Sequence, residues 1–257
     1  FPGFLVAWGY WVSIWCTNAA IAVALVGYLE VFFPILGQNK VLAVFTGLAV
    51  IWLFTWINSK PLKTVALVQL ITTVLKIIPI ILVGFIGIFY INTAHFFSIN
   101  ISGESSFSAI TITTTLTLFA FLGMESATIP SKNIKNAATT IKKATIAGTL
   151  ITIVVYIMSS IAIMGIIPPD ILLESNAPFA DAAGLFWGDS AKYIVAGGAV
   201  IATLGALNGW ILIQGQIPMA AAQDNLFPKI FGKVNSNNSP ITGIILSSIL
   251  ASVLMGL

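Results

Sequence analysis

Two charged residues lie inside long apolar runs of this sequence, where a charge is unfavourable. Glu125 follows a threonine-rich stretch, and Lys76 stands three residues before Pro79. An ionised group near the centre of a bilayer costs roughly 3 kcal/mol on insertion scales, so such groups usually face a cavity or a partner. Glu125 would balance a cationic ligand. Lys76 would act as a fixed or titrating cation beside carbonyls that the proline frees. The structural alternatives are an interfacial Glu125 and a snorkelling Lys76.

The composition indicates that these runs are membrane spans. Of the 257 residues, 58% are hydrophobic and 7% are charged, and the mean hydropathy is +1.02. Soluble domains carry about one quarter charged residues, so a soluble enzyme, a nucleic-acid-binding domain and a disordered tail are excluded. Cys16 and His95 are the only residues of their types, so no metal cluster or Ser-His-Asp set can form. We therefore expect no enzymatic activity, no cofactor and no bound metal.

Seven apolar segments approach the roughly 20 residues that a helical span needs. They cover residues 5–28, 41–57, 64–91, 107–129, 144–167, 193–222 and 241–257. Their apolar character is continuous rather than alternating, which disfavours a closed β-barrel. The sequence therefore predicts an all-α, polytopic membrane helix bundle, with one domain over residues 1–257.

The loops between these segments alternate in charge. Eight of the eleven lysines fall in every second loop, at positions 60, 63, 132, 135, 142, 143, 229 and 233. The other loops hold Lys40 and Lys192 together with six acidic residues. Because lysine-rich loops stay in the cytoplasm, we expect the chain to begin on the cytoplasmic side and its seventh span to end outside.

The segment 107–129 has features of a discontinuous helix. Five threonines occur in residues 111–117, and Gly123 stands two residues before Glu125. Unwound backbone of this kind lines midplane sites in transporters, so we predict a broken helix near Phe119–Glu125. Gly205 and Gly209 form a small-residue pair that predicts close helix packing. The aromatic rings of the first and sixth segments fit either substrate contact or core packing.

Several stretches resemble the amino acid–polyamine–organocation transporters, and among them the basic amino acid/polyamine antiporters, which include the arginine/agmatine antiporters. The stretches are residues 10–18, 119–127, 162–168, 177–183 and 209–228. The resemblance implies a twelve-helix fold with two inverted five-helix repeats in the inner membrane. This chain would supply the third to ninth family helices, without helices one, two and ten to twelve. It also implies a homodimer.

The same resemblance implies roles for individual residues. Substrate contacts are implied for Asn18, Ser13, Ile14, Ile21, Phe119, Glu125 and Trp210. Gating roles are implied for Tyr10, Phe119, Glu125 and Trp210. Asn18 fits helix bridging equally well. Phe119 stands where the arginine antiporters have a larger tryptophan, and Lys76 stands where they have a small residue.

We therefore expect a secondary transporter that exchanges a cationic amino acid for its amine or for another amino acid by alternating access. Its partners would be that small-molecule substrate and the bilayer, with no nucleic acid. A second hypothesis is a proton-coupled transporter of neutral amino acids in which Lys76 titrates. A third is a truncated carrier without transport activity.

Overall fold

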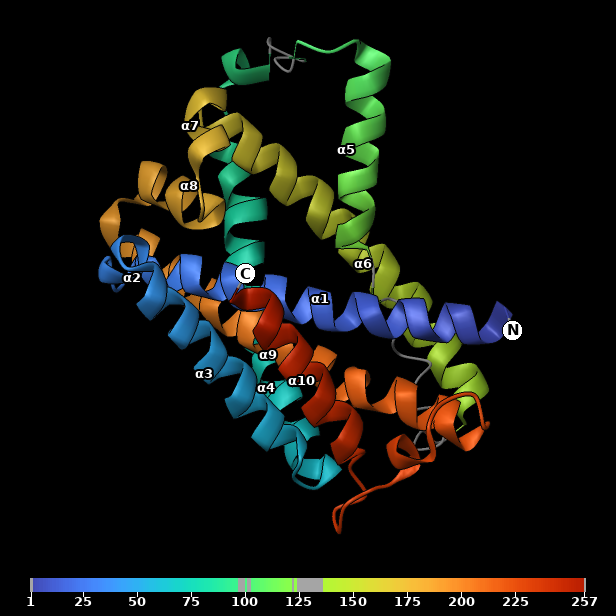
Figure 1. Ribbon diagram of the computed structural model, residues 1–257. Helices are drawn as coiled ribbons and strands as arrows, with labels where there is room; N and C mark the ends of the chain where they lie inside the picture. Colours follow the sequence, from blue (N-terminus) through green and yellow to red (C-terminus); the bar gives the residue numbers. More distant parts are fainter. Residues whose placement is uncertain (1, 97–99, 101–102, 122, 124–135, 257) are drawn as a thin grey trace. The chain divides into compact units, whose positions relative to one another are not determined.

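The computed structural model describes residues 2–96, 100, 103–121, 123 and 136–256 (Figure 1). Seven helices correspond to the predicted spans: α1 (Pro2–Glu30), α3 (Lys40–Asn58), α4 (Leu62–Ile81), α5 (Ser106–Ala120), α6 (Ala137–Ile166), α9 (Asp189–Gln223) and α10 (Ile241–Met255). A π-helical turn η1 (Leu82–Ile86) and a 3-10 turn η2 (Gly87–Tyr90) prolong α4. Shorter helices are α2 (Ile35–Gln38), η3 (Thr93–Phe96), α7 (Pro169–Glu174), α8 (Pro178–Trp187) and η6 (Lys229–Gly232). These residues include no β-strand, and the predicted all-α class is confirmed.

The helix lengths match a bilayer. Five segments are long and apolar enough to cross one: Pro2–Glu30, Lys40–Asn58, Leu62–Tyr90, Ala137–Ile166 and Ser190–Gln223. Ser106–Leu118 and Ile241–Met255 are apolar but shorter. Large apolar side chains point outward, for example Phe45 and Ile151, each 65% exposed. Such exposure is unfavourable in water and is expected where the surrounding solvent is lipid.

The chain folds into two compact units. The first unit comprises Phe1–Pro79 and Asn176–Leu257, and it contains α1 to α3, most of α4, and α8 to α10. The second unit comprises Ile80–Ser175, with the end of α4, α5, α6 and α7. The single domain expected over residues 1–257 stays a prediction.

Helix α1 is the central helix of the first unit and packs against α9, α10 and α3. Its buried residues recur every three or four positions, so one stripe faces the core. Ala19 and Ala22 of that stripe pack with Ile51 of α3, Leu207 of α9 and Ile244 of α10. Figure 1 shows α3 and α10 side by side. Small residues on α1 therefore let several helices approach at one level.

Glycines mark the closest helix contacts of the first unit. A Cβ atom at Gly205 would lie 2.6 Å from Cβ of Thr72 in α4, and one at Gly209 would lie 3.3 Å from Oε1 of Gln69. The close packing predicted for this pair is confirmed. A second contact, between Gly215 of α9 and α10, was not predicted.

The loops of the first unit gather at two ends, as the alternation of charge requires. Asn235 and Asn237 donate hydrogen bonds to the Ser59 carbonyl oxygen, at 2.9 and 3.0 Å. This joins the turn between α3 and α4, where Lys60 lies just before Lys63 of α4, to the loop that follows Lys229 and Lys233. The ring of Phe32, after α1, lies 5.8 Å from that of Tyr193, near the start of α9. The two lysine-rich loops of this unit therefore share one end.

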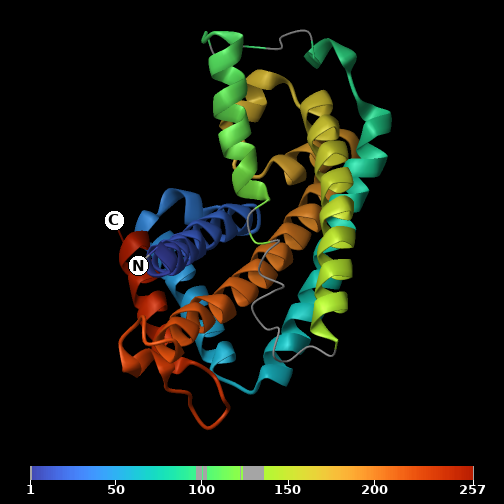
Figure 2. The same ribbon diagram turned by 90° about the vertical axis from the view of Figure 1, so that its right-hand side faces the viewer.

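The second unit is built around α6. Residues 82–96 run along α6, as Figure 2 shows. A Cβ atom at Gly84 would meet Ser159 at 3.3 Å, and one at Gly165 would meet Ile91 at 2.8 Å. Nδ1 of His95 lies 2.9 Å from the Gly165 carbonyl oxygen. Glycines in residues 82–96 and in α6 therefore allow these two segments to pack closely. His95 adds a hydrogen bond to the backbone of α6.

Helix α5 ends where the sequence predicts a helix break. Its last residue is Ala120, and Gly123 has φ of 100°, in the left-handed region that favours glycine. Residues 124–135, which include Glu125, lie outside the described residues. The structure therefore describes the end of α5 at the start of the predicted break. The rest of the break, beyond Gly123, lies outside the described residues.

Candidate functional site

Asn18 occupies the centre of the first unit. It lies on the buried stripe of α1 between Ile14, one turn before it, and Ala22, one turn after it. Asn18 is 0% exposed. A buried amide is unfavourable unless its polar atoms are hydrogen-bonded, so the partners of Asn18 decide what it can do.

A network of polar side chains surrounds Asn18, and we call it the amide network. It consists of Asn18 of α1, Thr55 of α3, Gln214 of α9 and Ser248 of α10. Nδ2 of Asn18 donates to Oε1 of Gln214 at 2.7 Å, and Nε2 of Gln214 donates to Oγ of Ser248 at 2.9 Å. The hydroxyls of Ser248 and Thr55 are 2.7 Å apart. Four helices therefore meet through side-chain hydrogen bonds in an apolar core.

Two buried polar atoms near this network have no hydrogen-bond partner among the described residues. They are Oδ1 of Asn18 and Nε1 of Trp15. Leaving a buried acceptor unpaired costs about 1–3 kcal/mol, and most buried polar groups are paired. An exception at the centre of the unit is a candidate point for ligand contact.

A second pair of buried amides joins α3, α4 and α9. Nδ2 of Asn58 donates to Oδ1 of Asn208 at 3.2 Å, and Nδ2 of Asn208 donates to Oε1 of Gln69 at 2.9 Å. Asn208 lies six residues before Gln214 on the same helix. This pair makes no bond to Asn18 and provides an internal comparison for the amide network.

Lys76 lies near the end of α4 and is half-buried. It forms no ion pair with an acidic side chain in the described parts of the chain. Helix α4 continues past Pro79 to Ile81, and proline has no N–H to donate to the carbonyl of Leu75. Of the backbone carbonyls that Pro79 was expected to free near Lys76, only that of Leu75 loses its bond in this way. The helix widens into the π-helical turn η1 only from Leu82.

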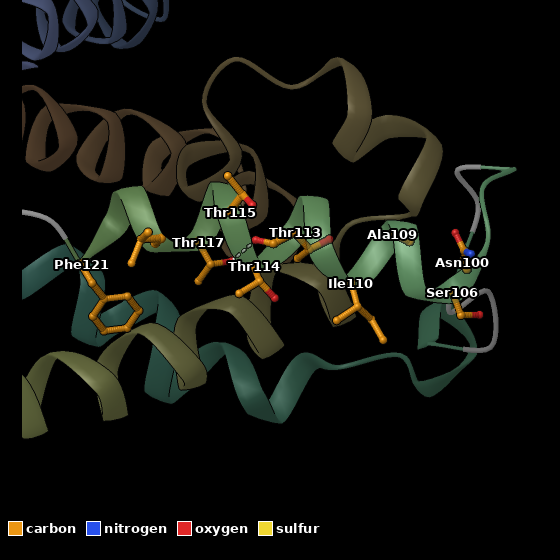
Figure 3. Close-up of a pocket in the computed structure, with 10 residues that line it drawn as sticks. Asn100, Ser106, Ala109, Ile110, Thr113, Thr114, Thr115, Thr117 and Phe121 are labelled. Atoms are coloured by element: carbon orange, nitrogen blue, oxygen red, sulfur yellow. Dashed lines mark hydrogen bonds between the residues drawn. The ribbon is translucent and has the colours of Figure 1, made fainter.

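A groove of about 650 Å³ runs along α5 in the second unit (Figure 3). Ile110, Thr114, Thr117 and Phe121 line it at helical spacing, and Figure 3 shows Ile110, Thr114 and Phe121 on the same side of the helix. The Phe121 ring meets the ring of Tyr156 of α6 at 5.4 Å between centroids, in an edge-on arrangement. The groove thus combines hydroxyls with an aromatic end.

The threonines of α5 mostly bond to their own helix. Hydroxyls of Thr111, Thr115 and Thr117 donate to the carbonyl four residues earlier, at 2.9, 2.9 and 2.7 Å. A hydroxyl whose hydrogen is used in this way offers only its lone pairs to a ligand. Thr117 therefore presents a hydrogen-bond acceptor to the groove, which suits a cationic ligand.

The other predicted site residues are less constrained. Ser13 is exposed, and its hydroxyl donates to the Tyr10 carbonyl at 2.7 Å. Tyr10, Ile21 and Trp210 are half-buried. Ser13, Ile14, Asn18 and Ile21 share α1, and Trp210 lies one turn before Gln214 on α9. The Phe119 side chain and all of Glu125 lie outside what is described.

Sequence reasoning missed the partners of Asn18 in the amide network. Gln214, Ser248 and Thr55 were not singled out, because single polar residues in apolar runs are common and nothing local links residues 18 and 214. Trp11 is one of the rings of the first segment that fit either substrate contact or core packing, and it packs edge-on against Phe227 at 5.7 Å and donates from Nε1 to Oγ of Ser247 at 2.7 Å. Trp11 is therefore part of the core.

Comparison with known proteins gives a consistent picture. The family of sequences described as amino acid permease matches residues 1–257. The cadaverine/lysine antiporter of Escherichia coli K12 is 32% identical, over 96% of this chain and 55% of the relative. The putrescine transporter of Haemophilus influenzae is 30% identical, over 98% of this chain and 58% of the relative. The arginine/ornithine antiporter of Pseudomonas aeruginosa is 27% identical, over 99% of this chain and 54% of the relative. The chain spans about half the length of these curated relatives.

Proposed function

Because this chain belongs to the amino acid permease family, and is a multi-pass membrane protein by its helices, we propose that it works in secondary transport. The proposed activity is exchange of a cationic amino acid for an amine or a second amino acid by alternating access. Relatives named as antiporters of arginine and ornithine or of cadaverine and lysine support it.

The observation that carries this proposal is one buried hydrogen-bond acceptor in the first unit. Oδ1 of Asn18 is bonded to none of the described residues. Ammonium and guanidinium groups carry donors and no acceptor. A cationic substrate end therefore complements this oxygen better than a neutral apolar one.

The substrate contacts proposed for Asn18, Ser13, Ile14, Ile21, Phe119, Glu125 and Trp210 rest on the family resemblance. So do the gating roles of Tyr10, Phe119, Glu125 and Trp210. In this proposal Glu125 balances the substrate charge, Asn18 hydrogen-bonds it, and the aromatic residues gate access. The inner membrane, a cytoplasmic start of the chain and a homodimer belong to the same proposal. The shared end of the lysine-rich loops supports the orientation.

A second candidate function is proton-coupled transport of neutral amino acids. One observation favours it: Lys76 is half-buried within a span and has no ion-pair partner among the described side chains. Such a lysine can change its protonation state during a transport cycle. In the exchange mechanism Lys76 would instead be a fixed cation that bonds backbone carbonyls.

A competition panel separates the two functions. The full-length protein is reconstituted in proteoliposomes, and uptake of a labelled amino acid is competed by arginine, lysine, ornithine, cadaverine and leucine. Cation exchange predicts strong competition by the cationic compounds and weak competition by leucine. The reverse order, with uptake that rises with an inward proton gradient, would support the second candidate and contradict the first.

A further inference from the structure

The orientation of the Gln214 side chain is fixed by a backbone carbonyl, which can only accept hydrogen bonds. Its Nε2 donates to the Ile244 backbone carbonyl at 3.1 Å and to Oγ of Ser248 at 2.9 Å. A carbonyl oxygen only accepts hydrogen bonds, so the amide nitrogen of Gln214 must face α10. Oε1 of Gln214 is thereby directed at Asn18.

This orientation in turn fixes Asn18. Oε1 of Gln214 only accepts, so Asn18 must offer its Nδ2, and the two atoms are 2.7 Å apart. A flipped Asn18 would place two carbonyl oxygens against each other in a buried site. Oδ1 of Asn18 is consequently held on the opposite side of the amide, without a partner among the described residues.

We propose that Gln214 is a positioning residue that holds Asn18 as a hydrogen-bond acceptor for the donor-rich end of the substrate. The inference rests on the proposed cation exchange and deepens it, because it says how the site distinguishes substrate ends. A freely rotating asparagine offers either a donor or an acceptor. An asparagine held by Gln214 keeps Oδ1 on the side away from Gln214, which matches an ammonium or guanidinium group and mismatches a substrate end that carries only acceptors, such as a carboxylate.

The burial of the amide network strengthens this discrimination. Asn18 and Gln214 are each 0% exposed, so water does not compete for Oδ1 in this conformation. An unpaired acceptor in an apolar surrounding attracts a charged donor more strongly than an acceptor exposed to water does.

Two substitutions in the full-length protein test the role of Gln214. Gln214→Met keeps a side chain of similar length and removes the acceptor, so Asn18 can turn. Gln214→Glu keeps an oxygen directed at Asn18, and its second oxygen, protonated in this buried site, donates to the Ile244 carbonyl in place of Nε2. We measure inhibition of labelled arginine uptake by lysine and by leucine in proteoliposomes, and we take the ratio of the two inhibition constants as selectivity. Gln214→Met should lower this selectivity about tenfold, which corresponds to about 1.4 kcal/mol, mainly through KM for the cation. Gln214→Glu should retain it.

A rescue variant and a control separate positioning from general loss of structure. Adding Asn18→Asp to Gln214→Met should restore selectivity, because a carboxylate offers acceptors in either rotamer. The control is Asn208→Leu, which removes a buried amide from the same helix but leaves Asn18 and Gln214 bonded. It should lower the midpoint of thermal unfolding with selectivity unchanged within a factor of about two.

The outcomes distinguish a failure of the role proposed for Gln214 from a failure of the proposed cation exchange. If wild-type protein transports no cationic substrate, the proposed function fails and the inference fails with it. If wild-type protein exchanges cations and Gln214→Met keeps wild-type selectivity, only the inference is overturned. An equal loss of selectivity in Asn208→Leu would also overturn it. Where Gln214→Met gives no folded protein, a folded Gln214→Glu protein that has lost cation selectivity contradicts the inference equally.

Discussion

The crossing of α9 and α10 is the contact whose perturbation can be worked out most fully. A Cβ atom at Gly215 would lie 2.5 Å from Cγ1 of Ile244, 2.9 Å from Cγ of Pro240 and 3.2 Å from the Pro240 carbonyl oxygen. Gly243 faces the same crossing, and its Cβ would lie 3.1 Å from the Gly215 Cα atom. Gly215→Ala therefore requires the Ile244 side chain and α10 to shift, because the Pro240 ring cannot move independently of its backbone and the Pro240 carbonyl oxygen is already close.

Overpacking of this kind costs about 1–3 kcal/mol. A loss of about 2 kcal/mol lowers the unfolding midpoint by about 4–8 °C for a domain of 150–250 residues. The same shift would lengthen the 3.1 Å bond from Gln214 to the Ile244 carbonyl, so the amide network should loosen together with the helix contact.

Heating followed by fluorescence-detected size-exclusion chromatography in detergent measures this midpoint for the full-length protein. The matched control is Gly9→Ala on α1, where a Cβ atom would meet no described atom within 4 Å. Alanine is a better helix former than glycine by about 1 kcal/mol, so the control midpoint should stay or rise slightly. A Gly215→Ala midpoint equal to that of the wild type would refute the tight crossing.

Three further substitutions address the transport site. Glu125→Gln should abolish uptake of cationic substrates and spare neutral ones, and unchanged arginine uptake would remove Glu125 from the site. Lys76→Ala should slow uptake at every pH if Lys76 is a fixed cation, and loss of a wild-type pH dependence would favour proton coupling instead. Thr117→Val should raise KM for a cationic substrate about threefold by removing one acceptor. Its control, Thr111→Val, removes the same kind of backbone bond outside the groove lining and should leave KM unchanged.

The helices could be predicted because the relevant information is local. Each apolar run is close to the length of a span, and each predicted segment coincides with a helix in the parts described. The two largest differences are α6, which begins at Ala137 rather than at residue 144, and α5, which ends at Ala120 within the predicted segment 107–129. The end of α5 near Gly123 could also be predicted, since glycine favours the left-handed backbone that a helix end requires. The short helices α7 and α8 were missed, although each begins with a proline at its first turn.

The amide network could not be predicted, because its information is not local. Asn18 and Gln214 are separated by 196 positions, and only the packing of α1 on α9 brings them together. Taken alone, either residue is a single polar side chain in an apolar run, which is common. The same holds for Gly215, whose role depends on where α10 crosses α9. Sequence reasoning could identify Asn18 as a candidate and could not identify what fixes its orientation.

The central claim is that the protein exchanges cationic substrates across the membrane. The most direct test loads proteoliposomes containing the full-length protein with unlabelled arginine, lysine or ornithine, or with buffer alone, and follows entry of labelled arginine from outside. Cation exchange predicts rapid entry only into vesicles loaded with a cationic substrate, with one molecule leaving for each that enters. Equal entry into buffer-filled vesicles, or entry supported by loaded leucine as well as by arginine, would contradict it.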